Sequence, residues 1–308
     1  MKLTFLGTGG AWGLPELNCD CRICRQMRLG NEKRERTALL LTHESSLLID
    51  CGPDIRDQLC RHSVSRLDAV LITHEHGDHY LGMDELVSFK RTSPRGEFRP
   101  IPVFLTARSW KVIGAQFGYL EKMGVITVHE VKPSTAFRVK EFEVFPFKTS
   151  HGSFALGSVG YSIKVGHNPG NAAHLVYTSD FVDLPEHPTQ IFNPDYLIIQ
   201  SFWLNEPRIN TPQHMSFQRA VEFIKLWKPI QRTFLVHIGD GDWIKGDPAN
   251  KMSKKREPAQ PMKPPQGGSH YPVPLNQEEW EGVVEEICAD YGLPCKCTVA
   301  YDDLCVQL

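Results

Sequence analysis

The segment at residues 73–79 most constrains what this chain can fold into. It reads Thr73-His74-Glu75-His76-Gly77-Asp78-His79 and directly follows an apolar run at residues 67–72. Three imidazoles and the Asp78 carboxylate packed this densely are hard to bury, because each buried polar group needs a partner. A metal centre supplies partners for all of them, and imidazole and carboxylate ligands suit zinc, manganese or iron.

The same segment has room to serve two metals. Alternation along an extended chain places His74 and His76 on one face, and the loop beyond can turn Asp78 and His79 toward a neighbouring position. A merely solvated histidine cluster is the alternative. The cluster, however, ends a strand-like run and precedes a helix-like stretch at residues 83–90, which is where α/β proteins usually keep their sites.

Composition describes an ordinary globular chain. Of its 308 residues, 41% are hydrophobic and 23% are charged, so it can bury a substantial core. Lys and Arg number 34 against 36 Asp and Glu, so no global basic field indicates nucleic acid. No apolar run approaches the ~20 residues that span a bilayer, and residues 1–7 read as a strand and glycine turn rather than a signal peptide. The odd number of cysteines, nine, fits a reducing cytosol and predicts a cytoplasmic protein.

Strand and helix patterns are mixed along the whole chain. We expect strands at residues 2–6, 38–42, 46–50, 67–73, 101–106, 125–131, 142–149, 160–165, 173–179, 196–200 and 233–236. Helices are expected at 109–123, at 217–227 with Ser216 as N-cap, and after Asn276. Proline density at about 242–274 predicts a long loop insertion, either a solvated excursion or a lid or oligomer contact.

A second metal site is indicated near the amino end. Cys19, Cys21 and Cys24 lie within six residues, and three thiolates at this spacing can wrap one tetrahedral zinc. A closed thiolate site of this kind is structural rather than catalytic. Spacing leaves the fourth ligand open: Cys51, Cys60 and a residue nearer the carboxyl end all qualify.

Residues 73–79 resemble the T-H-x-H-x-D-H signature of the metallo-β-lactamase superfamily, whose fold is a single-domain α/β sandwich, αββα, with a dinuclear site at one edge. Further matches are Leu48-Ile49-Asp50-Cys51-Gly52, Ser150-His151-Gly152, Tyr177-Thr178-Ser179-Asp180 and Leu235-Val236-His237-Ile238. The resemblance implies one metal held by His74, His76 and His151, and another held by Asp78, His79 and His237. It implies that Asp180 bridges them and that Asp50 orients ligand histidines. Zinc or manganese is the expected metal.

A narrower resemblance points to the PhnP-related phosphodiesterases. It rests on Leu6-Gly7-Thr8-Gly9-Gly10, the cysteine cluster and Ile49-Asp50-Cys51-Gly52-Pro53-Asp54. These enzymes carry a structural zinc beside a dinuclear site and hydrolyse small phosphodiesters, including a ribose 1,2-cyclic phosphate. Their catalytic histidine falls on His214, which is expected to contact the phosphate or protonate the leaving oxygen, because histidine can hold a proton near pH 7.

The resemblance also implies a fourth ligand for the structural zinc and a closing strand, and at the fourth-ligand position this chain departs from the family. Where the family has a histidine as fourth ligand of the structural zinc, this chain has Asp240, so the implied set is Cys19, Cys21, Cys24 and Asp240. Residues 300–304 resemble the family's closing strand. The residues expected to take part in catalysis are His214, Asp78 and Asp50.

The sequence therefore predicts a metal-dependent phosphodiesterase of one domain, residues 1–308, acting on a small substrate. No membrane partner is expected, nucleic acid is disfavoured, and a homodimer is left open. One alternative is an RNA 3′-end processing nuclease, since those enzymes share the Phe5-Leu6-Gly7-Thr8 opening. Another is a non-catalytic carrier like the pyrroloquinoline quinone biosynthesis B proteins, which share the cysteine cluster but have a degraded metal set.

Overall fold

Two apolar faces on the early strands explain why the chain forms stacked layers. In strands β1 (Lys2–Gly7) and β2 (Ala38–Thr42), Leu3, Phe5 and Leu39 face a core shared with the other sheet. The intervening residues, such as Leu6 and Leu40, face the opposite way into a core shared with helices. Side chains alternate across a strand, so a strand that is apolar on both faces must be covered on both.

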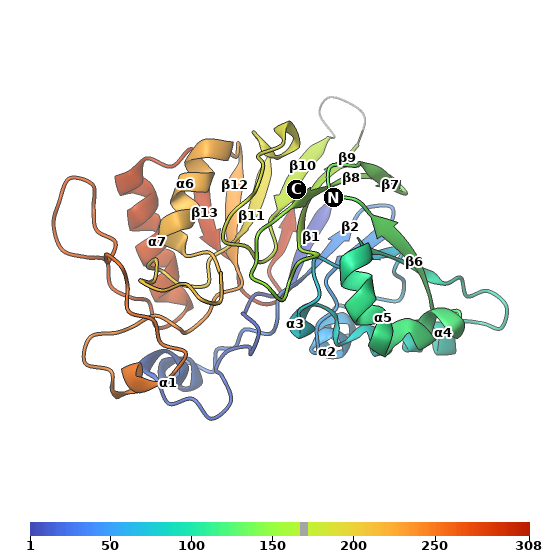
Figure 1. The fold of residues 1–308 in the computed structure, drawn as a ribbon, viewed down its shortest axis with the longest axis horizontal. Coiled ribbons are helices and arrows are strands. Elements are labelled where there is room, and N and C mark those ends of the chain that lie inside the picture. The colour runs from blue at the N-terminus through green and yellow to red at the C-terminus, as the bar shows by residue number, and fades with distance from the viewer. Residues whose placement is uncertain (167–171) are drawn as a thin grey trace.

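Two seven-stranded sheets result (Figure 1) in the computed structural model, which describes residues 1–166 and 172–308. The first has the order β14 (Cys305–Gln307), β1, β2, β3 (Ser46–Ile49), β4 (Ala69–Leu71), β5 (Ile101–Thr106) and β6 (Ile126–Val131). The second has the order β13 (Lys296–Val299), β12 (Arg232–Val236), β11 (Tyr196–Gln200), β10 (Ala173–Tyr177), β9 (Val159–Val165), β8 (Phe142–Lys148) and β7 (Phe137–Val139).

Helices cover the outer face of each sheet, which completes an αββα sandwich. The first sheet packs against side chains of α2 (Ile55–Arg61), η1 (Met83–Leu86) and α5 (Ala107–Lys122). The second packs against α6 (Phe217–Trp227) and α7 (Gln277–Tyr291), through Trp227 and Trp280 among others. The remaining helices are α1 (Arg22–Leu29), α3 (Gly77–Tyr80), α4 (Val87–Thr92), η2 (Thr189–Ile191) and η3 (Pro248–Lys251). No helix in the described ranges is long and apolar enough to cross a membrane.

Two expected strands differ most from the structure. The strand expected at 67–73 is shorter, because the Thr73 N–H leaves the ladder and donates to the Asp50 carboxylate at 2.8 Å. The stretch expected to form a closing strand at 300–304 is instead largely a turn, with a left-handed Asp303, and it joins β13 in one sheet to β14 in the other.

Parallel pairing decides where functional side chains gather. β3 runs parallel to β4, and β10, β11 and β12 run parallel to one another. The carboxyl ends of parallel strands meet at one edge of a sheet, so the loops that follow them lie together there.

Candidate metal centre

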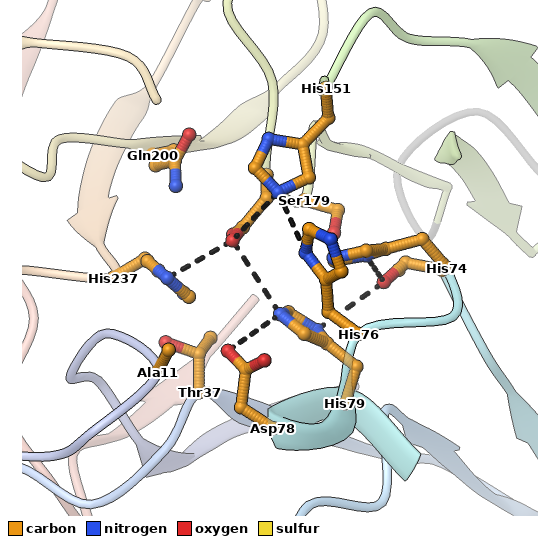
Figure 2. Close-up of polar contacts among 12 residues, drawn as sticks. Ala11, Thr37, His74, His76, Asp78, His79, His151, Ser179, Gln200 and His237 are labelled. Carbon is orange, nitrogen blue, oxygen red and sulfur yellow. Dashed lines mark hydrogen bonds and ion pairs between the residues drawn. The ribbon is translucent and has the colours of Figure 1, made fainter. Parts of the chain in front are cut away.

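Polar side chains occupy the carboxyl ends of strands from both sheets. Asp50 follows β3, His74 to His79 follow β4, His151 follows β8, Asp180 follows β10, Gln200 ends β11 and His237 follows β12. Figure 2 shows the imidazoles of His76 and His79, from the loop after β4, converging on one point with those of His151 and His237 from two other segments. The structure thus brings together all seven residues expected as active-site ligands.

The first ligand group consists of His74, His76 and His151, whose ligand atoms all lie within 4.8 Å of one another. The Nε2 atom of His151 and the Nδ1 atom of His76 are 3.1 Å apart. Two nitrogens on one tetrahedral zinc, each at its usual bond length, are separated by about 3.3 Å. The observed separation therefore fits two ligands of one ion.

The second group consists of Asp78, His79, Asp180 and His237. The Oδ2 atom of Asp180 lies 3.0 Å from His237 Nε2 and 3.6 Å from His79 Nε2. The same oxygen lies 3.7 Å from Nε2 of His151, which belongs to the first group. Asp180 therefore stands between the two groups, as a bridging carboxylate must.

Hydrogen bonds to the far side of three rings fix which nitrogen faces the centre. His79 Nδ1 donates to Asp50 at 2.7 Å, and His151 Nδ1 donates to the Gln213 carbonyl at 3.0 Å. His74 Nδ1 lies 3.0 Å from the Thr73 hydroxyl, which itself donates to Asp50. Each of these rings is left with an Nε2 lone pair directed inward, the arrangement that metal-binding histidines need.

Several buried atoms of the centre lack partners. Among the described residues, His74 Nε2, His79 Nε2, Asp180 Oδ1 and both ring nitrogens of His237 have no hydrogen-bond partner. A buried polar atom left unpaired costs about 1–3 kcal/mol. Two divalent cations would satisfy these atoms except His237 Nδ1, since His237 faces the centre with Nε2, so the residues present fit a dinuclear metal centre.

Protonation states support the same reading. Burial lowers the pKa of His74, His151 and His237 below the ordinary histidine value, which keeps these imidazoles neutral. Burial opposes ionisation of Asp180, but His237 and His79 hold the pKa of its carboxyl well below the usual range. Neutral imidazole and ionised carboxylate are the forms that bind metals.

His79 differs from His74, His151 and His237 in that its pKa is raised. Burial favours its neutral form, yet the carboxylates of Asp78, Asp50 and Asp180 raise its pKa well above the ordinary value. Three acidic groups thus converge on one imidazole, and the site attracts positive charge. A divalent ion would supply that charge in place of the proton.

Glu75 lies inside the motif but belongs to neither ligand group. Its carboxylate accepts hydrogen bonds from the Ser109 hydroxyl at 2.8 Å and from the Gly157 N–H at 3.1 Å. It ties the ligand loop to the start of α5 and to the loop after His151, so its role is to position both.

His214 borders the centre and its ring orientation is fixed. Gln200 Nε2 donates to His214 Nδ1 at 2.7 Å, and the Gln200 Oε1 atom accepts from the backbone N–H groups of Phe181 and Met215, each at 3.0 Å. Phe202 stacks on the ring with a centroid distance of 4.5 Å. Burial lowers the pKa of His214 to about 3. The ring is therefore neutral with its proton on Nε2.

A second cluster contains the three cysteines. The Sγ atoms of Cys19, Cys21 and Cys24 lie 3.6, 3.4 and 3.0 Å from the Oδ2 atom of Asp240. A sulfur and an oxygen on one tetrahedral zinc are about 3.6 Å apart, so these four residues also fit a zinc ion. Neither Cys51, buried under the first sheet, nor the exposed Cys60 joins them.

The proline-rich segment covers this cluster. Lys254 Nζ lies 2.5 Å from Asp240 Oδ2, and Asp247 accepts the Arg22 N–H at the first turn of α1 at 2.9 Å. Ala249 packs into the same apolar cluster as the cysteines. Figure 1 shows the orange segment beside the blue α1. None of the described residues lining the cavity at the metal centre comes from 242–274, so the segment does not form a lid over it.

Sequence reasoning missed three residues that support these sites, Thr73, Gln200 and Lys254. Gln200 had a usable signal, because it is a polar residue ending a fully buried strand, as Asp180 and His237 follow theirs. Lys254 had none, since it is one of several basic residues in an irregular segment.

Sequence comparison decides the family. A family model described as a beta-lactamase superfamily domain matches residues 45–238, more than half of the chain. The chain belongs to the beta-lactamase superfamily. The assignment made from residues 73–79 is confirmed, and so is the prediction of a metallo-β-lactamase sandwich.

Curated proteins are similar to this chain over part of their length. An octanoyltransferase of Porphyromonas gingivalis is 28% identical over 249 residues, covering 77% of this chain and 46% of that protein. A ribonuclease Z of Pyrococcus horikoshii is 32% identical over 167 residues, covering 52% of this chain and 47% of that protein. The chain thus spans about half the length of the curated relatives it matches.

Solved structures match the superfamily fold along the whole chain. A diphosphatase from the PhnP family aligns with a TM-score of 0.69 and 22% identity, covering 100% of this chain and 96% of that one. PqqB from Methylobacterium extorquens, solved with Zn²⁺ bound, aligns with a TM-score of 0.71 and 18% identity, covering 100% of both chains. The short form of human tRNase Z aligns with a TM-score of 0.64 and 19% identity, covering 100% of this chain and 99% of that one. At these identities the likeness is one of fold.

Proposed function

We propose that this chain is a metal-dependent hydrolase that cleaves a small phosphodiester. The observation that carries the proposal is the complete set of seven ligand side chains, His74, His76, Asp78, His79, His151, Asp180 and His237, in two adjoining groups. Two divalent ions held there, zinc or manganese, would lower the pKa of a water molecule and stabilise the attacking and leaving oxygens.

The surrounding residues have distinct roles in this proposal. Asp50 and Thr73 hold the rings of His79 and His74 in the orientation that binding requires. His214 presents its Nε2–H to the cavity, because Gln200 occupies the Nδ1 side. A neutral donor in that place can hydrogen-bond to a phosphate oxygen or to the departing oxygen. The Cys19, Cys21, Cys24 and Asp240 set would hold a structural zinc.

Hydrolysis of bis(p-nitrophenyl) phosphate tests the proposal. Purified protein supplied with manganese or zinc should release p-nitrophenol, and the His76→Ala/Asp180→Ala double variant should not, because each metal group loses a ligand. His62→Ala is the matched control, since His62 pairs with Asp303 away from the centre. Undiminished turnover by the double variant would contradict the proposal.

Ribonuclease activity is the second candidate, favoured by the sequence similarity to ribonuclease Z from Pyrococcus horikoshii. Tight tRNA binding that weakens steeply with added salt would support it, because phosphate contacts release counterions. The near-neutral chain charge, −2, does not favour such binding.

A carrier role predicts a different metal content. About three ions per chain support the enzyme, whereas one ion bound by the cysteines alone supports a carrier. The complete ligand set favours the enzyme. A cytoplasmic location and a homodimer remain predictions for localisation and light-scattering measurements.

A further inference from the structure

The cavity beside the metal centre has an apolar entrance. It measures about 600 Å³ and is bordered by the metal ligands His76, Asp78, His151 and Asp180 and by His214. Three large apolar side chains also line it: Trp12 is 72% exposed, Phe154 is 84% exposed and Leu81 is 46% exposed. Scattered apolar residues on a surface are ordinary, but two exposed aromatic rings beside a reactive centre indicate a binding surface.

Free positive charge is scarce in the same cavity. Of the residues that line it, only Arg36 carries a permanent positive charge. Its guanidinium is already engaged, since Nη1 donates to both Asp54 carboxylate oxygens at 3.0 and 3.3 Å and Nε donates to the Ala11 carbonyl at 3.2 Å. One phosphate could be held by metals, but a second phosphate would find no unpaired cation on the cavity wall.

We propose that the substrate is a singly charged phosphodiester with an aromatic substituent, whose ring packs against Trp12 and Phe154. This inference rests on the proposed function and narrows its substrate class. The cavity volume is within the 300–1,000 Å³ typical of small-molecule sites and admits such a diester. The charge pattern disfavours diphosphate compounds, although a PhnP-family diphosphatase shares the fold.

Binding and turnover, measured separately, test this inference. Calorimetry with metal-loaded protein compares diphenyl phosphate with dimethyl phosphate, which carries the same charge without rings. Diphenyl phosphate should bind at least tenfold more tightly, because ring stacking contributes favourably for each aromatic contact. Trp12→Ala/Phe154→Ala should remove most of that preference and leave dimethyl phosphate binding within about twofold. Leu17→Ala is the matched control, because Leu17 is 92% exposed and lies outside the cavity lining.

Two outcomes would overturn the inference. Equal affinity for the two diesters in the unaltered protein would show that the rings are not recognised. Tighter binding of diphenyl diphosphate than of diphenyl phosphate would show that the site favours a second charge.

Turnover separates this inference from the proposed function. If the protein prefers diphenyl phosphate but hydrolyses no phosphodiester, the proposed function fails while ring recognition stands. If the protein hydrolyses bis(p-nitrophenyl) phosphate and Trp12→Ala/Phe154→Ala leaves the KM for it unchanged, ring recognition fails while the proposed function stands.

Discussion

Four residues of the centre adopt a backbone conformation that side chains usually avoid. Asp50, Ser179, Gln213 and His237 have φ values of +65°, +56°, +56° and +58°. Each non-glycine residue held in this region costs about 1–2 kcal/mol. Each stands at a strand end or beside a site residue, where a left-handed step turns a side chain out of the strand direction and toward the cavity. Local strain is therefore concentrated where ligands are positioned.

The Asp50 carboxylate is expected to control metal affinity without touching the metal. Asp50→Asn removes the charge that holds the His79 Nδ1–H and the Thr73 hydroxyl. Losing such a partner typically lowers metal affinity about 10–100-fold. Titration against a competing chelator measures the change. Asp57→Asn, on the exposed side of α2, should have no effect, and unaltered affinity in Asp50→Asn would contradict the assigned role.

Gln200 is expected to act on turnover through His214. Gln200→Met removes the donor to His214 Nδ1 and leaves the Phe181 and Met215 N–H groups unpaired. We expect kcat to fall about tenfold or more, because a poorly oriented hydrogen-bond donor stabilises the departing oxygen less, with metal content unchanged. Nitrogen NMR should show His214 losing its single tautomer. Gln116→Met on the exposed side of α5 serves as control, and a lost metal would show instead that Gln200 supports the ligands.

Among single residues, the sequence identifies the metal ligands better than the residues that surround and position them. His151, Asp180 and His237 each follow a strand-like apolar run, so the pattern marks them once a motif supplies the context. Trp12 and Phe154 carry no such signal, because they lie in turns and meet only through the folded chain.

Among the elements, strands were easier to predict than the short helices. The expected ranges 38–42, 101–106 and 196–200 coincide with β2, β5 and β11, because buried strands form continuous apolar runs. Helices α1 and α2 were missed. In α1 the cysteines indicate metal binding and obscure the helical spacing of Ile23 and Met27. Before α2, Asp54 stands where a capping residue is expected, but its carboxylate binds Arg36 instead.

The proline-rich element is expected to stabilise the cysteine site through charge. Three thiolates and a carboxylate give a zinc site two net negative charges, and Lys254 offsets one of them from 2.5 Å. Lys254→Met should lower zinc affinity about tenfold, in the range seen when outer partners of metal ligands are removed. Zinc retained after dialysis against graded chelator measures this.

Two further variants make that test specific. Lys251→Met changes an exposed lysine of the same segment and should retain zinc. Asp240→His introduces a neutral ligand, so in a protein that carries it, adding Lys254→Met should leave zinc affinity unchanged. Greater zinc retention in Lys254→Met alone would show that the lysine competes with the metal.

On the scale of the whole molecule, the centre joins the two sheets. His74, His76, Asp78 and His79 follow a strand of the first sheet, whereas His151, Asp180 and His237 follow strands of the second. Metals bound there would therefore link two layers that are otherwise held by the apolar core between them. The layer order itself follows from alternation in the sequence, but the docking of the layers depends on contacts between residues far apart along the chain.

Metal removal is expected to lower thermal stability. Ions present at a hundred times their dissociation constant stabilise by about 2.7 kcal/mol per site, which corresponds to a melting temperature shift of about 4 °C for one site in a domain of 308 residues. Differential scanning fluorimetry after chelation, and again after adding manganese, measures the shift. Asp180→Ala should not recover with manganese, and an unchanged melting temperature in the unaltered protein would count against metal linkage.

The division of ligands between the sheets also sets an order in time. A chain emerges from the ribosome from its amino end, so the four ligands of residues 74–79 appear long before His151, Asp180 and His237. Neither metal group is complete until residues of the second sheet have been synthesised and docked. A growing chain thus carries at least one incomplete ligand group until residue 237 has been added, and the dinuclear centre can form only after that.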